Sequence, residues 1–177
     1  MILSFHRNCQ DHKVIKSRVL TSGLFLCNFI SNSTTMTYSL KVNYLCPHCR
    51  SYLRVWNNII LIVKSDSKNL QSILLLNPEL GNYDLIHHSS IEFEEGEMLD
   101  FICPVCRADL TAIELHRNLV RIIMIDENNT EFDVYFSKIC GEHSTFLIHK
   151  DDIVEKYGEE SSVYVNYFMS RLKKKKT

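Results

Sequence analysis

Residues 43–53 read NYLCPHCRSYL, and residues 100–110 read DFICPVCRADL. Each stretch contains the motif Cys-Pro-x-Cys, followed at once by an arginine and soon afterwards by a leucine. Each motif also follows a segment with the residue types of a β-strand, residues 42–45 and 98–102. The sequence therefore predicts two similar tight turns, each entered from a strand and each carrying two cysteines.

The candidate metal ligands are the four cysteines of these turns: Cys46, Cys49, Cys103 and Cys106. Two thiolates of one turn must reach a shared tetrahedral ion at about 2.3 Å. Proline fixes φ in the turn, and backbone N–H groups of the turn can donate to the sulfurs. Two turns supply a closed set of four thiolates, which is the arrangement of a structural site for one Zn²⁺ ion. The 53 intervening residues exceed the usual spacing of roughly 15–20, so a segment is inserted between the turns.

The pattern resembles the zinc-ribbon class, in which two Cys-Pro-x-Cys knuckles at β-hairpin tips share one zinc ion. The resemblance covers residues 41–56 and 97–112 and implies a small zinc-binding protein of bacterial type. In the commonest form of the knuckle a glycine follows the second cysteine, whereas this chain has Arg50 and Arg107 there. Iron in a rubredoxin-like site uses similar knuckles and is the alternative metal.

Other interpretations of the cysteines stay open, namely buried free thiols, or disulfides if the protein is secreted. Residues 46–49 also match, letter for letter, the active-site motif of some thioredoxin-fold disulfide oxidoreductases. In those enzymes a helix follows the first cysteine and lowers its pKa, but residues 50–56 read as a strand. Cys140 and His143 form a further pair that could bind a second metal, or Cys140 could be a buried thiol beside a turn.

The composition indicates one soluble globular domain, because the chain has 177 residues, of which 45% are hydrophobic and 23% charged. No apolar run approaches the roughly 20 residues that span a bilayer. The net charge of −1 is uneven: residues 1–35 carry +3, residues 171–177 carry +5, and the middle therefore carries −9. An acidic body with basic ends is a poor general nucleic-acid binder, since affinity for a duplex comes largely from Lys and Arg on phosphates.

The predicted domain organisation has three parts. Residues 1–35 are interpreted as a disordered or non-native N-terminal extension, with Met36 as the true start; a signal peptide with its apolar region at 19–30 is the alternative. Residues 36–170 form a single zinc-ribbon-containing domain. Residues 171–177 form a basic disordered tail that could capture RNA or an anionic surface.

The expected fold is a mostly β, small α+β domain: a zinc ribbon of two knuckle hairpins, an inserted β segment, a C-terminal hairpin and one short helix. Residues 59–64 and 145–148 read as strands, and residues 119–125 and 131–136 read as the arms of a hairpin. Residues 70–76 fit a strand or a helix equally well. The short helix is expected from Asp151 or Asp152 to Tyr157, stopped by Gly158, and residues 163–172 lean towards a strand. Apart from the two knuckles, the sequence has no evident internal repeat.

The sequence favours a non-enzymatic binding or adaptor module with a structural zinc ion, because phosphate-loop and hydrolase motifs are missing and four thiolates leave no open coordination position. Reduced thiolates predict a cytoplasmic protein. Another protein is the expected partner, through aromatic side chains near the first knuckle: Tyr44, Tyr52 and Trp56. One alternative is a nucleic-acid-binding zinc ribbon that acts in transcription or translation through the basic tail and a set of arginines: Arg50, Arg54, Arg107, Arg117 and Arg121. The other is a thiol–disulfide oxidoreductase that uses Cys46 and Cys49.

Overall fold

The computed structural model describes residues 42–175, with side chains for residues 42–170, so the expectations for residues 1–35 lie outside the described residues. The chain forms ten strands and one helix within this range. The elements are β1 (Asn43–Leu45), β2 (Arg54–Val55), β3 (Asn58–Ser65), β4 (Leu70–Leu76), β5 (Leu85–Ile86), β6 (Asp100–Ile102), β7 (Leu119–Ile125), β8 (Glu131–Ser137), β9 (Thr145–His149), β10 (Asp152–Tyr157) and α1 (Ser161–Lys175). The predicted class, a small and mostly β domain with one short helix, is confirmed.

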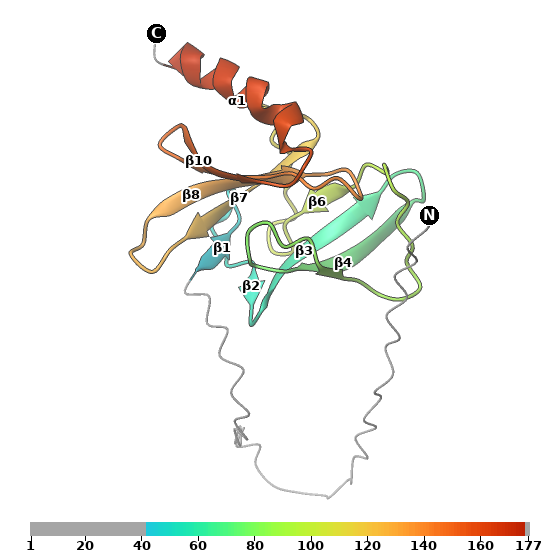
Figure 1. Ribbon diagram of the computed structural model, residues 1–177. Helices are drawn as coiled ribbons and strands as arrows, with labels where there is room; N and C mark the ends of the chain where they lie inside the picture. Colours follow the sequence, from blue (N-terminus) through green and yellow to red (C-terminus); the bar gives the residue numbers. More distant parts are fainter. Residues whose placement is uncertain (1–41, 176–177) are drawn as a thin grey trace, which may run out of the picture. The chain divides into compact units, whose positions relative to one another are not determined.

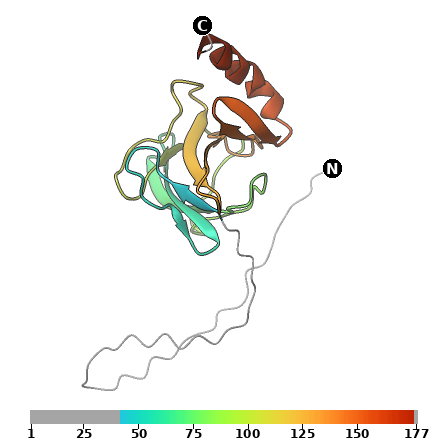
Figure 2. The ribbon, with the colours of Figure 1, turned by 90° about the vertical axis from the view of Figure 1, so that its left-hand side faces the viewer.

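The strands form two antiparallel sheets. Sheet A has the order β1-β7-β8-β9-β10, and sheet B has the order β2-β3-β4-β5, with β6 paired to β3 as well. Alternate residues of β7 and β8 point to opposite faces of sheet A, as the period of a strand requires. Ile122 and Val134 join the core shared with sheet B, whereas Leu119 and Tyr135 join a second core under α1. The domain thus has three layers, with α1 on the side of sheet A away from sheet B (Figures 1 and 2).

The described chain contains two similar halves, which we define as residues 43–76 and 100–137. Each half has a short strand, a cysteine knuckle and then a long hairpin, which is β3–β4 in the first half and β7–β8 in the second. The short strands are exchanged between the halves, because β1 pairs with β7 and β6 pairs with β3. The registers match: Leu45 lies opposite Ile123, and Ile102, its equivalent, lies opposite Ile62.

The central core reflects this duplication. Of its buried residues, all but Leu99 and Leu147 fall into pairs of equivalent positions from the two halves. The pairs are Tyr44 and Phe101, Cys46 and Cys103, Leu53 and Leu110, Ile59 and Val120, Leu61 and Ile122, Val63 and Met124, and Leu74 and Val134. One core therefore depends on both halves, and neither half buries its apolar face alone.

The C-terminal helix was predicted in the wrong place. The segment expected to be a short helix is strand β10, which pairs with β9, and the segment that leaned towards a strand is α1. Lys150 and Asp151 both have positive φ, 47° and 68°, and form the two-residue turn that joins β9 to β10. Helix α1 continues to Lys175, into the segment for which the sequence predicts a basic tail.

Candidate metal centre

The two knuckles have the same backbone hydrogen bonds. In the first knuckle the N–H of Cys46 donates to the carbonyl of Ser51 at 3.0 Å, and the N–H of Arg50 donates to the carbonyl of Cys46 at 3.0 Å. The second knuckle repeats both bonds 57 residues later, from Cys103 to Ala108 at 2.9 Å and from Arg107 to Cys103 at 3.1 Å. Since bonds of this kind close the turn, both cysteines of each pair are held at one hairpin tip.

Pairing between the halves brings the two tips together. The sulfurs of Cys46, Cys49, Cys103 and Cys106 all lie within 4.8 Å of one another. The distances between Cys46 Sγ and Cys106 Sγ and between Cys49 Sγ and Cys103 Sγ are both 3.8 Å. Four sulfurs that surround a tetrahedral ion at about 2.3 Å are separated by about 3.8 Å. A disulfide needs about 2.05 Å, and all four thiols are free. The four predicted ligands therefore lie close enough to hold one metal ion.

Backbone N–H groups point at the sulfur of the first cysteine in each knuckle. The amide of His48 lies 3.4 Å from Cys46 Sγ, and the amide of Val105 lies 3.4 Å from Cys103 Sγ. Such donors stabilise a thiolate, which is the form of cysteine that binds a metal. The sequence-based expectation that the turn amides face the sulfurs is confirmed.

Arg50 and Arg107 occupy the position where the commonest knuckle has glycine, and both adopt the left-handed backbone that glycine would supply. Their φ angles are 62° and 64°. A side chain in this region costs roughly 1–2 kcal/mol, because its Cβ approaches a carbonyl oxygen. The departure from the commonest sequence therefore leaves the turn geometry intact and adds strain.

The surroundings of the sulfurs differ within the first knuckle. Burial raises the pKa of Cys46 to about 12, whereas the hydroxyl of Ser51, 3.3 Å from the sulfur, lowers the pKa of Cys49 to about 6. Ser51 is not among the site residues predicted from the sequence, and the second knuckle has Ala108 at the equivalent position. The signal that could have identified Ser51 is a hydroxyl side chain two residues after the second cysteine of the knuckle.

The position of the Cys46 sulfur is relevant to the thiol–disulfide alternative, in which this sulfur would attack the substrate. Cys46, the first cysteine of its motif, is fully buried and lies at a hairpin tip, and a turn and a short strand follow it instead of a helix. A reactive cysteine needs an exposed, electropositive site such as a helix N-terminus. The geometry therefore gives redox catalysis at this motif no support.

The other candidate ligands lie apart from the cluster. Within residues 42–175, neither Cys140 nor His143 belongs to any group of three or more residues that could hold a metal. The ring of His143 stacks on Tyr83, with centroids 4.3 Å apart and planes 8° from parallel. Nε2 of His48 lies 3.1 Å from the carbonyl oxygen of Asp109 in the other knuckle, a contact that joins the two tips.

Three of the five arginines proposed for nucleic-acid binding make contacts within the domain. Arg50 forms an ion pair with Glu131, and Nε of Arg121 donates to Asp133 at 2.9 Å. Nε of Arg54 donates to the carbonyl of Trp56 at 2.9 Å. Nucleic-acid binding stays a prediction, and three of the arginines on which it depends have side-chain contacts within the domain.

The comparisons with protein-family models, with curated proteins and with solved structures give no match for this chain. In the described part of the chain, no helix is both long enough and apolar enough to cross a bilayer.

Proposed function

We propose that this chain is a non-enzymatic binding module whose two halves are joined by one structural Zn²⁺ ion. The observation that carries the proposal is the convergence of two equivalent knuckles, with cross-knuckle sulfur separations of 3.8 Å. All four ligands would be cysteine, which leaves zinc no open position for water or substrate. In this proposal the knuckles act as a zinc ribbon, and the reduced thiolates belong in a reducing compartment such as the cytoplasm.

A protein partner fits the surface near the first knuckle better than the other partner classes do. Tyr44, one of the three aromatics named from the sequence, is buried, but Tyr52 and Trp56 are 66% and 88% exposed. Val55, between them, is also exposed. Exposed tyrosine and tryptophan are enriched at protein interfaces, where large rigid side chains supply much of the binding energy. We therefore assign the partner-binding role to this surface, residues 52–56.

The metal proposal is tested by native mass spectrometry of the wild-type chain and the Cys103→Ser variant. We expect one zinc ion per wild-type chain. The variant should lose the ion and melt at a markedly lower temperature, since structural zinc contributes on the order of 10 kcal/mol in small domains. Cys140→Ser is the matched control, because Cys140 is a partly buried free cysteine that lies outside the sulfur cluster.

Two outcomes would contradict the proposal. One is a Cys103→Ser variant that keeps both its metal and its melting temperature. The other is iron, with its visible absorption, in protein purified from cells supplied with both metals. Trp56 is the only tryptophan of the chain, so its fluorescence offers a direct probe for any protein that covers residues 52–56.

A further inference from the structure

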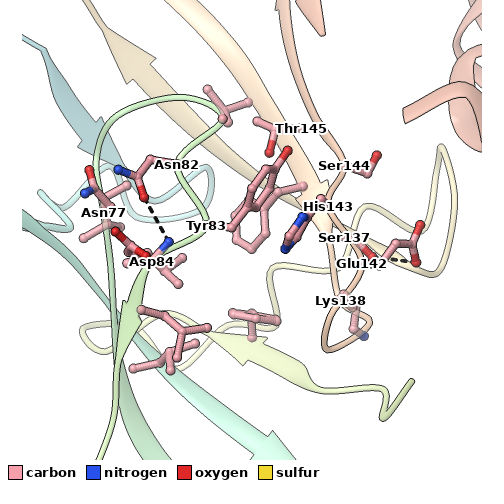
Figure 3. A pocket seen from close by; sticks show the side chains of 18 of the residues that line it. Asn77, Asn82, Tyr83, Asp84, Ser137, Lys138, Glu142, His143, Ser144 and Thr145 are labelled. Atoms are coloured by element: carbon pink, nitrogen blue, oxygen red, sulfur yellow. Dashed lines mark hydrogen bonds between the residues drawn. The ribbon is translucent and has the colours of Figure 1, made fainter. Parts of the chain in front are cut away.

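A cavity of about 260 Å³ lies between the two sheets. It opens between residues 77–84, which follow β4, and residues 138–144, which follow β8, so the two loops come from equivalent places in the two halves. Figure 3 shows Asn82, Tyr83 and Asp84 on one side and His143, Ser144 and Thr145 on the other. The metal centre does not share a lining residue with this cavity.

The walls of the cavity are apolar and rich in aromatic rings. Leu76, Phe93 and Phe136 are only partly buried although they pack against the central core, because they face this space. Phe101 and Phe136 meet edge to face, with centroids 5.3 Å apart. Rings arranged in this way offer edges and faces to a further aromatic ring.

The mouth of the cavity is acidic. The lining includes two exposed carboxylates, those of Glu79 and Asp84, and one ammonium group, that of Lys138. That ammonium is 2.5 Å from Oδ1 of Asp100, so its charge is already offset. A ligand with a negative charge would therefore meet net repulsion, whereas a neutral or positive group would not.

One polar side chain in the lining, the buried hydroxyl of Tyr83, has no partner in hydrogen-bond geometry among the described residues. Burial raises the pKa of Tyr83, and the Thr145 side chain beside its hydroxyl partly offsets that shift (Figure 3). A buried hydroxyl without a partner is unfavourable, so a guest that supplies a hydrogen-bond partner is favoured.

We propose that this cavity is a binding site for a small aromatic molecule that carries a neutral or cationic polar group, such as an aromatic amine. Its volume exceeds the roughly 150 Å³ of an apolar cavity that holds one benzene ring, so one ring or a fused pair fits. Tyr83 and His143 lie beside the opening of the cavity. Their rings stack on each other with centroids 4.3 Å apart, and His143 is exposed.

The test uses three probes with one ring system: indole, tryptamine and indole-3-acetate, which are neutral, cationic and anionic at neutral pH. Each is titrated into the metal-loaded protein and followed by NMR chemical shifts. We expect tryptamine and indole to bind and to shift the resonances of Leu76, Phe93 and Phe136. Indole-3-acetate should bind at least about tenfold more weakly, because its charge meets the acidic mouth.

Two variants of the same strand sharpen the test. Leu76→Trp should fill the cavity and weaken tryptamine binding at least about tenfold, as expected when a ligand site is occupied by a side chain. Ile73→Trp adds the same ring at an exposed position outside the cavity and should leave the affinity unchanged. If Leu76→Trp fails to fold, Asp84→Asn serves instead, because it should reduce the discrimination against indole-3-acetate.

The proposal is overturned if none of the probes binds at millimolar concentration. It is also overturned if tryptamine and indole-3-acetate bind equally, or if Ile73→Trp weakens binding as much as Leu76→Trp does. Native mass spectrometry of the same samples reports the metal content. A failure of the cavity proposal is therefore distinguishable from a failure of the zinc proposal.

Discussion

Arg107 combines a left-handed backbone with a side chain that makes no ion pair within residues 42–175, unlike Arg50, which pairs with Glu131. No ion pair of the Arg107 side chain with residues 42–175 therefore offsets the backbone strain at this position. Glycine would hold the same φ of 64° without a Cβ to approach the neighbouring carbonyl.

We expect Arg107→Gly to raise the free energy of unfolding by about 0.5–1 kcal/mol, the strain relieved less the greater chain entropy of glycine. Chemical denaturation of the metal-loaded protein measures the change. Arg107→Ala is the control, because it removes the charge but keeps the Cβ, and its stability should stay near that of the wild type. A glycine variant less stable than the alanine variant would contradict the strain argument.

Glu97 is the most heavily hydrogen-bonded carboxylate of the described residues. It accepts hydrogen bonds from Ser65 and, at 2.9 Å, from Ser67 Oγ, and it lies 3.3 Å from Lys68 Nζ. The Ser65 hydroxyl is the main cause of a pKa lowered from 4.5 to about 2, with the amide of Glu94 next. This carboxylate ties the β3–β4 turn to the acidic turn before β6.

The pH dependence of this contribution follows from the lowered pKa. Since the folded state binds the proton less tightly than the unfolded state, ionised Glu97 stabilises the fold above about pH 5, and the benefit disappears as the pH falls from 4.5 to 2. We expect Glu97→Gln to be less stable than the wild type at pH 7, by a difference that shrinks towards pH 3. Denaturation curves between pH 3 and 8 measure it. Glu94→Gln, at a more exposed carboxylate of the same turn, should change stability less, and a difference independent of pH would refute the assignment.

Among the elements, those with a strong local pattern could be predicted from the sequence. Residues 59–64 form an almost continuous β-branched and aliphatic run, and they lie within β3. Asp126 and Asn129 mark the turn of the β7–β8 hairpin: the Asp126 carboxylate accepts N–H bonds from the turn, and Asn129 has a φ of 58°. Side chains of these types favour such turns in any protein, so tertiary context is not needed.

The C-terminal elements could not be predicted, because tertiary contacts override their local preferences. The β9–β10 turn uses Lys150 and Asp151 at positive φ, where Asn-Gly or Asp-Gly is the usual signal. Aromatic and β-branched residues fill α1 and lean towards a strand, yet Tyr164 and Phe168, four residues apart, share one buried face. The helix is favoured because this face covers sheet A.

Phe168 provides the test of how α1 is held. Its ring packs on Phe146, with centroids 4.4 Å apart, and on Tyr135 at 5.3 Å. We expect Phe168→Ala to lower the free energy of unfolding by about 3 kcal/mol. Zinc content should stay the same, because the central core does not include this ring. Met169→Ala, one residue further on and exposed, should change stability by less than about 0.5 kcal/mol. Equal effects of the two variants would show that α1 is not docked as described.

At the scale of the whole molecule, the duplication is visible in the structure, whereas in the sequence only the two knuckles show it. The four site cysteines were predicted, because the chemistry of a thiolate set requires their identity. At most of the other equivalent core positions, such as Leu61 and Ile122 or Leu74 and Val134, the two residues are both buried but differ in type. Many hydrophobic residues can fill a buried position, so the sequence does not reveal that these positions are equivalent. The cavity between the sheets also escaped prediction, because its lining comes from segments far apart in the chain.

Equivalent cysteines should have equal importance if the centre joins the two halves symmetrically. We expect Cys49→Ser and Cys106→Ser to lower the melting temperature by similar amounts, although Cys106 is exposed and Cys49 is partly buried. Calorimetry of both variants, with and without a chelator, measures this. Chelation should destabilise the wild type strongly and the two variants only slightly. A large difference between the variants would mean that one knuckle folds without the other.

The exchange of β1 and β6 also sets the order in which the protein can assemble during translation. Leu45 pairs with Ile123 of β7, 78 residues further along, and the sulfur cluster is incomplete until Cys106 has left the ribosome. Until then the nascent chain carries two free thiols in a knuckle whose entry strand, β1, lacks its partner β7. We therefore expect the proposed zinc ion to bind only after both halves have been synthesised.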